Sequence, residues 1–202
     1  MGIKSRRERE REELRQSILD ASEELILQEG FEKLSMRKIA DKIEYSTTTI
    51  YNYYHNKAEI ICHLMRNIIE QIIAEFDRVF EQEFTSPVER LRTIIKIYIQ
   101  YGLDNPTHYK MFFITDVTEF KDYMTDFPGL EPFKRLVKVV EECIDAGSFY
   151  SEEAAVISQG IWSAVHGITS LLIVRPDFPW EEKDKLLDHI IQTLIRGLLK
   201  HP

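Results

Sequence analysis

The chain has 202 residues and a formal net charge of −8 at neutral pH, with 44% hydrophobic and 30% charged residues. These proportions exclude a disordered or fibrous protein and are sufficient for one compact core or two small ones. The two cysteines lie far apart, and the longest strongly apolar run, residues 168–174, is too short to span a bilayer. Since the first residues do not resemble a secretory signal, we expect a cytoplasmic protein with free thiols, no membrane segment, no metal and no cofactor.

The charge is unevenly distributed along the chain. Residues 1–60 contain 11 Lys and Arg against 12 Asp and Glu, whereas residues 61–202 contain 15 against 22. A polyanionic partner would therefore meet less repulsion from the first 60 residues than from the rest.

Helical periodicity dominates the sequence and no convincing alternating strand is present, so we expect an all-α fold. Residues 6–28 form the first expected helix, Ser35 caps a short second helix, and Ser46 opens a third. Asn56 and Glu59 have the spacing of a capping box at the start of a helix that runs to about residue 80. Further helices are expected from residue 87, from residue 106, over residues 132–146, from a cap at Ser151 to the residue before Pro176, and over residues 180–200.

The stretch STTTIYNYYHNK, residues 46–57, contains three threonines and three tyrosines. Two short helices joined by a tight turn, with a third packed across them, form a helix-turn-helix. Ile50 and Tyr54 share one helical face and are expected to point into the core. The residues left on the outward face are Thr47, Thr48, Tyr51 and Asn52. Because hydroxyl groups donate to phosphate oxygens, and Lys57 begins the next helix, this face is suited to double-stranded DNA.

Residues 39–60, IADKIEYSTTTIYNYYHNKAEI, resemble the signature of TetR-family transcriptional regulators. In that signature an Ile-Ala pair leads into Ser-x-x-Thr-Leu-Tyr, an aromatic residue and Ser-Lys-Glu-x-Leu. The matching positions are Ile39, Ala40, Ser46, Thr49, Ile50, Tyr51, Lys57 and Glu59, together with the helix-ending pair Gly30-Phe31. The resemblance implies a three-helix DNA-binding domain at residues 1–55, with its motif at 35–54, and a helical effector-binding and dimerisation domain at 56–202.

The resemblance further implies a homodimeric regulator, not an enzyme, that binds an operator and is released by a small-molecule effector. Most such regulators are repressors. By position, Thr47, Thr48 and Tyr51 would face base edges, with Arg37 entering from the first helix of the motif. The residues assigned to phosphates are Ser35, Thr49, Asn52, Tyr53 and Lys57. The Arg-rich start (Arg6, Arg7, Arg9 and Arg11) either adds a backbone contact or is a solvated helix of alternating charges.

Four positions depart from the family pattern. Glu44 stands where glycine is usual in the turn, which requires either a left-handed non-glycine residue or a different turn geometry. Thr48 replaces a small residue, Tyr53 stands at a common histidine position, and Tyr54 stands at a common phenylalanine position. These departures bear on base preference and leave the phosphate-facing groups in place.

The last two expected helices are wide enough in their apolar faces to pair with a second subunit, or alternatively to form ordinary core. The expected interface residues are Ile161, Val165, Ile168, Leu187, Ile191, Leu194 and Leu198. The resemblance also implies an effector cavity in the aromatic-rich middle of the chain, although aromatic core packing accounts for many of these residues equally well. The expected pocket residues are Tyr98, Tyr101, Phe112, Phe113, Trp162 and His166.

Trp162, His166 and Gly167 are similar to a Trp/His/Gly signature of one TetR subgroup. His166 can be read as a ligand contact, a pH-sensitive group or a hydrogen-bonded core histidine. An enzyme is disfavoured because the sequence has no Gly-rich phosphate loop, nucleophile elbow or metal-ligand spacing. A helical scaffold would use the hydroxyl face for a protein partner, and its binding would lack the steep salt dependence of phosphate contacts.

Overall fold

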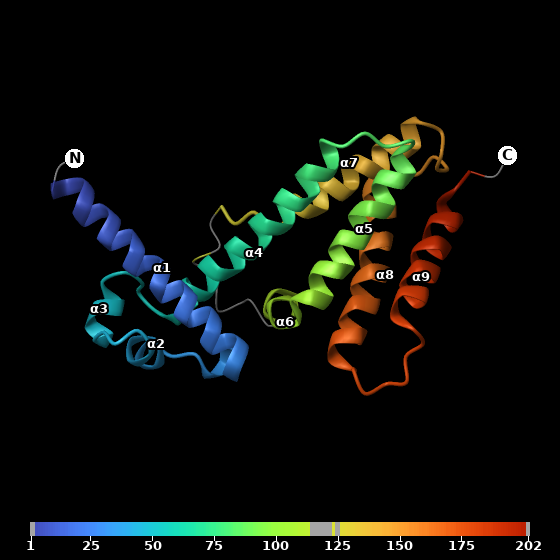
Figure 1. Cartoon of the computed structure of the whole chain (residues 1–202). Coiled ribbons are helices and arrows are strands. Elements are labelled where there is room, and N and C mark those ends of the chain that lie inside the picture. The colour runs from blue at the N-terminus through green and yellow to red at the C-terminus, as the bar shows by residue number, and fades with distance from the viewer. Residues whose placement is uncertain (1–2, 114–122, 124–125, 201–202) are drawn as a thin grey trace. The chain divides into compact units, whose positions relative to one another are not determined.

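The computed structural model describes residues 3–113, 123 and 126–200. Within these residues the fold is all-α, as predicted, and its one β feature is an isolated bridge between Phe149 and Leu199. The helices (Figure 1) are α1 (Ile3–Glu29), the 3-10 turn η1 (Phe31–Lys33), α2 (Met36–Lys42), α3 (Thr47–Tyr51), α4 (Lys57–Phe80), α5 (Pro87–Asp104), α6 (Pro106–Phe113), α7 (Glu131–Asp145), α8 (Ala154–Val174) and α9 (Lys183–Leu198).

Local capping determines where several helices begin. Ser35, Ser46 and Ser86 each accept a hydrogen bond from the backbone N–H three residues later, at 3.3, 3.1 and 3.3 Å. Each cap satisfies an amide that would otherwise lack a partner and contributes about 1 kcal/mol. Gly147, with φ of +70°, follows α7 as the expected stop. These boundaries confirm the sequence prediction.

The starts of α8 and α9 differ from the prediction. The N-cap of α8 is Glu153, and no side-chain hydrogen bond caps the helix, so Ser151 lies outside it. At α9 the Glu182 carboxylate accepts from two backbone amides and starts the helix at Lys183, later than expected. At α4 the predicted start is confirmed, since Asn56 caps the helix that begins at Lys57. Only the reciprocal bond of the capping box differs, because the Glu59 carboxylate accepts from the backbone N–H of His55, at 2.6 Å, and not from that of Asn56.

The chain divides into two compact units. Unit 1 comprises Met1–Ile68 and Thr107–Phe127, and unit 2 comprises Ile69–Pro106 and Pro128–Pro202. The expected boundary after residue 55 falls within unit 1, because α4 begins inside it: His63 of α4 is hydrogen-bonded to α1. Helix α4 therefore contributes its first part to unit 1 and its second part to unit 2.

Unit 1 is built around α1, with α2 packed on α1 and α3 packed on α2. Its fully buried side chains include Ile18, Ile26, Ile39, Ile50 and Tyr54.

In unit 2, α7 packs against both α5 and α8, and α5 also contacts α8 and α9. The Arg135 guanidinium of α7 donates two hydrogen bonds to the Asp77 carboxylate of α4, at 2.6 and 3.0 Å. This bidentate pair joins two helices of unit 2 and lowers the pKa of Asp77 below its usual range.

Among the described helices, α8 alone has the length and composition that a membrane span requires, although the sequence was expected to contain no such helix. This test is weak for a single helix, since a core helix of a soluble protein passes it too. In α8, 44% of the apolar window is buried inside the structure. Ile157, Ile161 and Val165 are at most 4% exposed, and the helix packs against α5 and α7. Packing therefore accounts for the buried part of its apolar surface.

The turn between α2 and α3 contains a strained residue. Glu44 has φ of +60°, so it adopts the left-handed conformation at the position where a glycine was expected. We predict that Glu44→Gly raises the free energy of unfolding by about 1 kcal/mol, because glycine has no Cβ to clash in this region. Urea denaturation measures the change. The control Glu13→Gly lies inside α1 and should lower the free energy of unfolding by a similar amount; a loss of stability in Glu44→Gly would contradict the prediction.

Candidate nucleic-acid interface

The inner face of α3 anchors this short helix to the core of unit 1. Ile50 of α3 and Tyr54, which follows it, are both 0% exposed, in agreement with the sequence prediction. Two ion pairs tie α2 to α1: Lys38 to Glu29 at 2.5 Å and Lys42 to Glu24 at 2.6 Å. The orientation of α3 is thus determined by apolar burial on one side and by the anchored α2 on the other.

The outer face of α3 is polar and accessible. Thr48, Tyr51 and Asn52 are exposed, and Tyr51 has 55% of its surface open to solvent. Thr47 and Thr49 are half-buried, and the Thr49 hydroxyl lies 2.9 Å from that of Ser46. Exposed hydroxyl and amide groups of this kind are able to hydrogen-bond to phosphate oxygens and base edges.

The other residues assigned to DNA lie around this helix and are partly engaged elsewhere. The Ser35 hydroxyl caps α2, and Arg37 is exposed with Asp41 at 3.8 Å. The Arg11 guanidinium of α1 lies 5.9 Å from the centre of the Tyr53 ring. Lys57 is the first residue of α4, where its charge adds to the positive end of that helix.

A hydrogen bond that local sequence patterns do not reveal supports the start of α4. Asn56 uses its side-chain oxygen to cap α4, accepting from Glu59 N–H at 3.0 Å, and donates from its amide nitrogen to the Tyr123 hydroxyl at 2.7 Å. Tyr123 is 67 residues further along the chain. The residue before Lys57 is therefore held from both sides.

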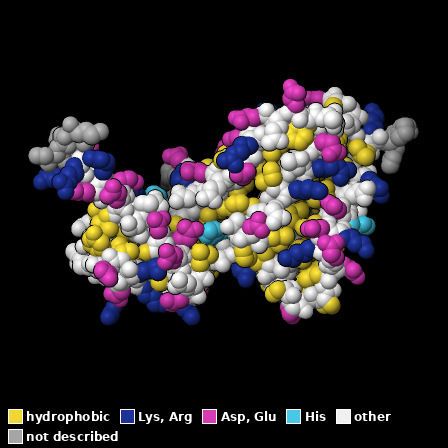
Figure 2. Space-filling model, viewed as in Figure 1, with side chains coloured by type: hydrophobic (Ala, Val, Ile, Leu, Met, Phe, Trp, Pro, Cys, Tyr) yellow, Lys and Arg dark blue, Asp and Glu magenta, His cyan; other side chains and the backbone are white. Residues whose placement is uncertain are grey.

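The beginning of α1 is rich in both arginine and glutamate, as the segment RRERERE at residues 6–12 shows. Figure 2 shows Lys and Arg side chains gathered at this end of the helix. Arg6 is mainly exposed and pairs with Glu10 at 2.7 Å, which is the pattern of a solvated helix of alternating charges. This arrangement is compatible with either expectation for the segment.

The expected effector-pocket residues fall into both units. In unit 2, the Trp162 indole N–H donates to the Tyr98 hydroxyl at 3.3 Å, and that hydroxyl lies 3.1 Å from His166 Nδ1. Tyr101 donates to Gln71 at 3.3 Å. In unit 1, Phe112 and Phe113 form an edge-to-face pair with ring centres 4.6 Å apart. His166 is thus a hydrogen-bonded, half-buried histidine, and burial lowers its pKa.

Four of the expected dimer-interface residues belong to the core of their own subunit, which corrects that part of the prediction. Ile161, Val165, Ile168 and Ile191 are at most 8% exposed. Leu187, Leu194 and Leu198 of α9 are half-buried. Gln159 and Trp162 are among the exposed residues of α8. The others form a stripe of Val156, Gly160, Ser163, Leu171 and Val174, with half-buried Gly167 among them. Apolar residues occur all around α8, so the pattern alone did not reveal which side faces inward.

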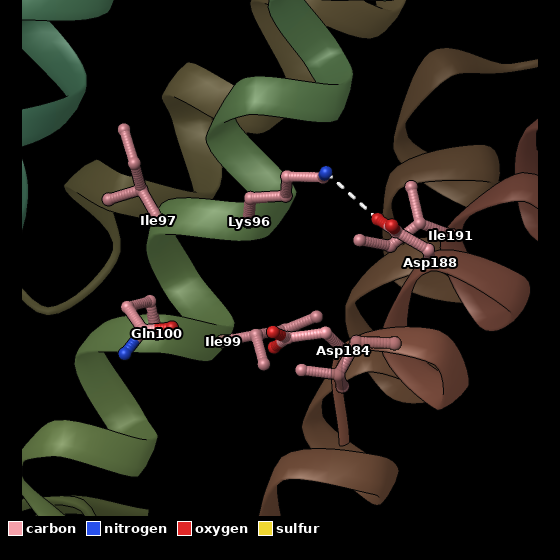
Figure 3. Close-up of a pocket in the computed structure, with 8 residues that line it drawn as sticks. Lys96, Ile97, Ile99, Gln100, Asp184, Asp188 and Ile191 are labelled. Carbon is pink, nitrogen blue, oxygen red and sulfur yellow. Dashed lines mark ion pairs between the residues drawn. The ribbon is translucent and has the colours of Figure 1, made fainter. Parts of the chain in front are cut away.

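A groove of about 450 Å³ lies between α5 and α9 (Figure 3). Ile97, Ile99, Leu187 and Ile191 supply its apolar surface, and Lys96 forms an ion pair of 2.8 Å with Asp188 across it. The remaining lining residues are Gln100 and Asp184. None of the six residues expected to form the effector pocket lines this groove.

The described residues offer no obvious catalytic or metal-binding constellation. No group of three or more His, Cys, Asp or Glu side chains in this part of the chain is arranged to hold a metal ion. Cys62 and Cys143 are buried, which raises the pKa of their thiols to about 11 and about 12. Thiols with such pKa values are poor nucleophiles at neutral pH.

Unit 1 has a buried core and an α3 whose polar face points outward, and unit 2 is helical. Together these features define a helix-turn-helix transcriptional regulator. The chain belongs to the TetR family. Residues 18–64 match the family described as bacterial regulatory proteins, tetR family, and residues 91–194 match the tetracyclin repressor-like C-terminal domain. Its members are DNA-binding regulators and not enzymes.

Individual relatives agree with this family membership. The chain is 23% identical over 189 residues to the HTH-type transcriptional regulator YobS of Bacillus subtilis, covering 90% of this chain and 91% of that protein. A protein of unknown function from Rhodococcus sp. RHA1 has a TM-score of 0.78 at 18% identity, covering 93% and 96% of the two chains. The fatty acid degradation regulator FadR from Bacillus halodurans has a TM-score of 0.73 at 17% identity, covering 90% and 94%. The structural matches establish the fold.

Proposed function

We propose that the chain is a repressor that binds its operator as a homodimer and is released by a small-molecule effector, acting in the cytoplasm where the DNA lies. The observation that carries this proposal is the exposed polar face of α3, made of Thr48, Tyr51 and Asn52. In this proposal these side chains, with Thr47, reach base edges, while Lys57 and the neighbouring hydroxyls hold phosphates.

Dimerisation is proposed through the exposed stripe of α8. Val156 and Leu171 are each 50% exposed and Val174 is 49% exposed, although all three are apolar. The glycines between them, Gly160 and Gly167, have no atom within 4 Å of the position a Cβ would take, so a second helix can approach closely there. The two DNA-binding domains of the dimer would then be held at a fixed distance and would bind two half-sites of the operator.

The effector is proposed to contact the Tyr98, Trp162 and His166 cluster of unit 2. The Tyr98 hydroxyl accepts from the Trp162 indole N–H and lies within hydrogen-bond distance of His166 Nδ1, so it links the two side chains. Aromatic side chains with a few convergent polar groups are typical of ligand-binding sites. A ligand releases DNA only to the extent that it binds the DNA-free conformation more tightly.

Selection of bound fragments from the source genome at low salt tests the proposed DNA binding. We expect a small set of fragments that share a palindromic sequence, and binding that weakens steeply as salt rises. Binding that is insensitive to salt, or absent for every fragment, would favour a scaffold that uses the same face for a protein partner.

We predict that Lys57→Ala weakens binding to all operator sequences alike, because a phosphate contact carries no base information. The slope of log affinity against log salt concentration should become less steep by about one for each DNA-binding domain. Affinity measured at several salt concentrations, on the operator and on a mismatched operator, gives both quantities. Lys183→Ala is a matched control, since Lys183 is also the first residue of a helix but lies in unit 2. A loss confined to one sequence would show that Lys57 reads a base.

A further inference from the structure

Unit 1 contains a cluster of titratable groups that the proposed DNA contacts do not use. Its members are Arg15 of α1, Tyr54 directly after α3, and His63 of α4. Arg15 and His63 are 48 residues apart in the sequence, and Arg15 Nη2 lies 3.2 Å from His63 Nε2. The cluster therefore joins the three helices that carry and support the outward face of α3.

The hydrogen bond between Arg15 and His63 determines the protonation state of the imidazole. A guanidinium only donates hydrogen bonds, so Nε2 of His63 must accept and carries no proton. The histidine is consequently neutral, with its proton on Nδ1. A second proton on the ring would remove this acceptor and place a positive charge next to the one on Arg15.

Tyr54 contacts both of these groups. The Arg15 guanidinium is 4.8 Å from the centre of the Tyr54 ring, and the Tyr54 and His63 rings meet edge to face with centres 5.4 Å apart. The backbone N–H of Tyr54 also donates to the carbonyl of Ile50, in α3, at 3.1 Å. A shift of Tyr54 would therefore move the end of α3 that carries Tyr51.

We propose that His63 is an acid-sensitive positioning residue of the DNA-binding head: its neutral form holds Arg15 and Tyr54 in place, and its protonation releases the operator. The inference rests on the proposed DNA binding. Arg15 can form the observed arrangement only with the neutral ring, so the binding-competent fraction falls about tenfold for each pH unit well below the pKa of His63.

The surrounding charges favour the neutral ring overall. Burial lowers the pKa of His63 below its ordinary value, Arg15 lowers it further, Glu59 opposes them, and Arg66 lowers it. Three other charged or titratable groups lie near the cluster. Glu12 of α1 interacts electrostatically with Tyr54, and the His55 ring is within hydrogen-bond distance of Glu59. The third is Asp126, whose backbone carbonyl accepts a hydrogen bond from Arg66. Because the folded head resists protonation more than the unfolded chain does, its stability decreases as pH falls below about 6.5.

The test compares operator affinity of the full-length protein from about pH 8 to about pH 5, at constant ionic strength, for the wild type and His63→Gln. Glutamine offers a carbonyl oxygen to Arg15 and does not titrate. We expect the wild type to lose affinity about tenfold per pH unit below the pKa and the variant to stay nearly level. His55→Gln is the control, because the His55 side chain is 85% exposed. This variant should lose operator affinity at low pH as the wild type does. Parallel losses in wild type and His63→Gln would overturn the proposal.

A second measurement does not depend on DNA. In NMR titrations of the wild-type protein, the His63 ring signals should change with a pKa below the ordinary value, and the amide signals of Tyr51 and Tyr54 should follow the same curve. Amide signals that ignore the titration of His63 would overturn the proposal even if operator binding is confirmed. If no genomic fragment binds at pH 8 but these signals move together, the positioning role stands and the DNA-binding proposal fails.

Discussion

Replacing Tyr51 with alanine is expected to weaken operator binding by about tenfold to a hundredfold, the equivalent of about 1–3 kcal/mol, with little change in stability. Tyr51 is 55% exposed and lies on the outer face of α3, so its removal opens no cavity. Tyrosine buries a large area in a groove with little loss of conformational freedom, and its hydroxyl can bond to a base edge or a phosphate.

Fluorescence anisotropy with a labelled operator measures this loss, and circular dichroism during heating reports the stability. Tyr51→Phe should lose only the binding free energy that the hydroxyl group contributes, which is about 0.5–1.5 kcal/mol for a neutral hydrogen bond. Tyr150→Ala is a matched control, since Tyr150 is also exposed, at 37%, but belongs to unit 2. An unchanged affinity of Tyr51→Ala would remove Tyr51 from the interface.

The double substitution Val156→Arg and Leu171→Arg is expected to convert the protein into a folded monomer. Both side chains are half exposed on the same stripe of α8, so arginine is tolerated in the free subunit. In a two-fold symmetric dimer the same patch of both subunits is buried together, so the added positive charges would repel one another and lose hydration. Operator affinity should fall about a hundredfold or more, because the two half-sites are then bound independently.

Analytical ultracentrifugation at several concentrations gives the oligomeric state of this variant. Leu130→Arg is the control: Leu130 is 70% exposed, precedes α7 and lies outside the α8 stripe, so its replacement should leave a dimer intact. A double variant that sediments as a dimer would place the contact on another surface, for example the half-buried leucines of α9.

The sequence predicted the helical fold well because its signals are local. A serine cap acts on the amide three residues later, as at Ser35 and Ser46, and a buried face recurs with the helical period, as at Ile50 and Tyr54. At Glu44 the family pattern left two alternatives, a left-handed residue or a different turn geometry, and the φ of +60° shows the first. For the same reason, the outward direction of Thr48 and Tyr51 followed from the spacing of their neighbours.

The sequence by itself thus determined the helices, the helix-turn-helix and the family, because these depend on short-range hydrogen bonds and on the period of apolar residues. Only the tertiary structure decided which side of α8 is buried, since this helix has apolar residues all around and either stripe could face the core. It also brought His63 to Arg15 and Tyr123 to Asn56, across 48 and 67 residues. Such contacts depend on how helices pack together, and no local pattern encodes them.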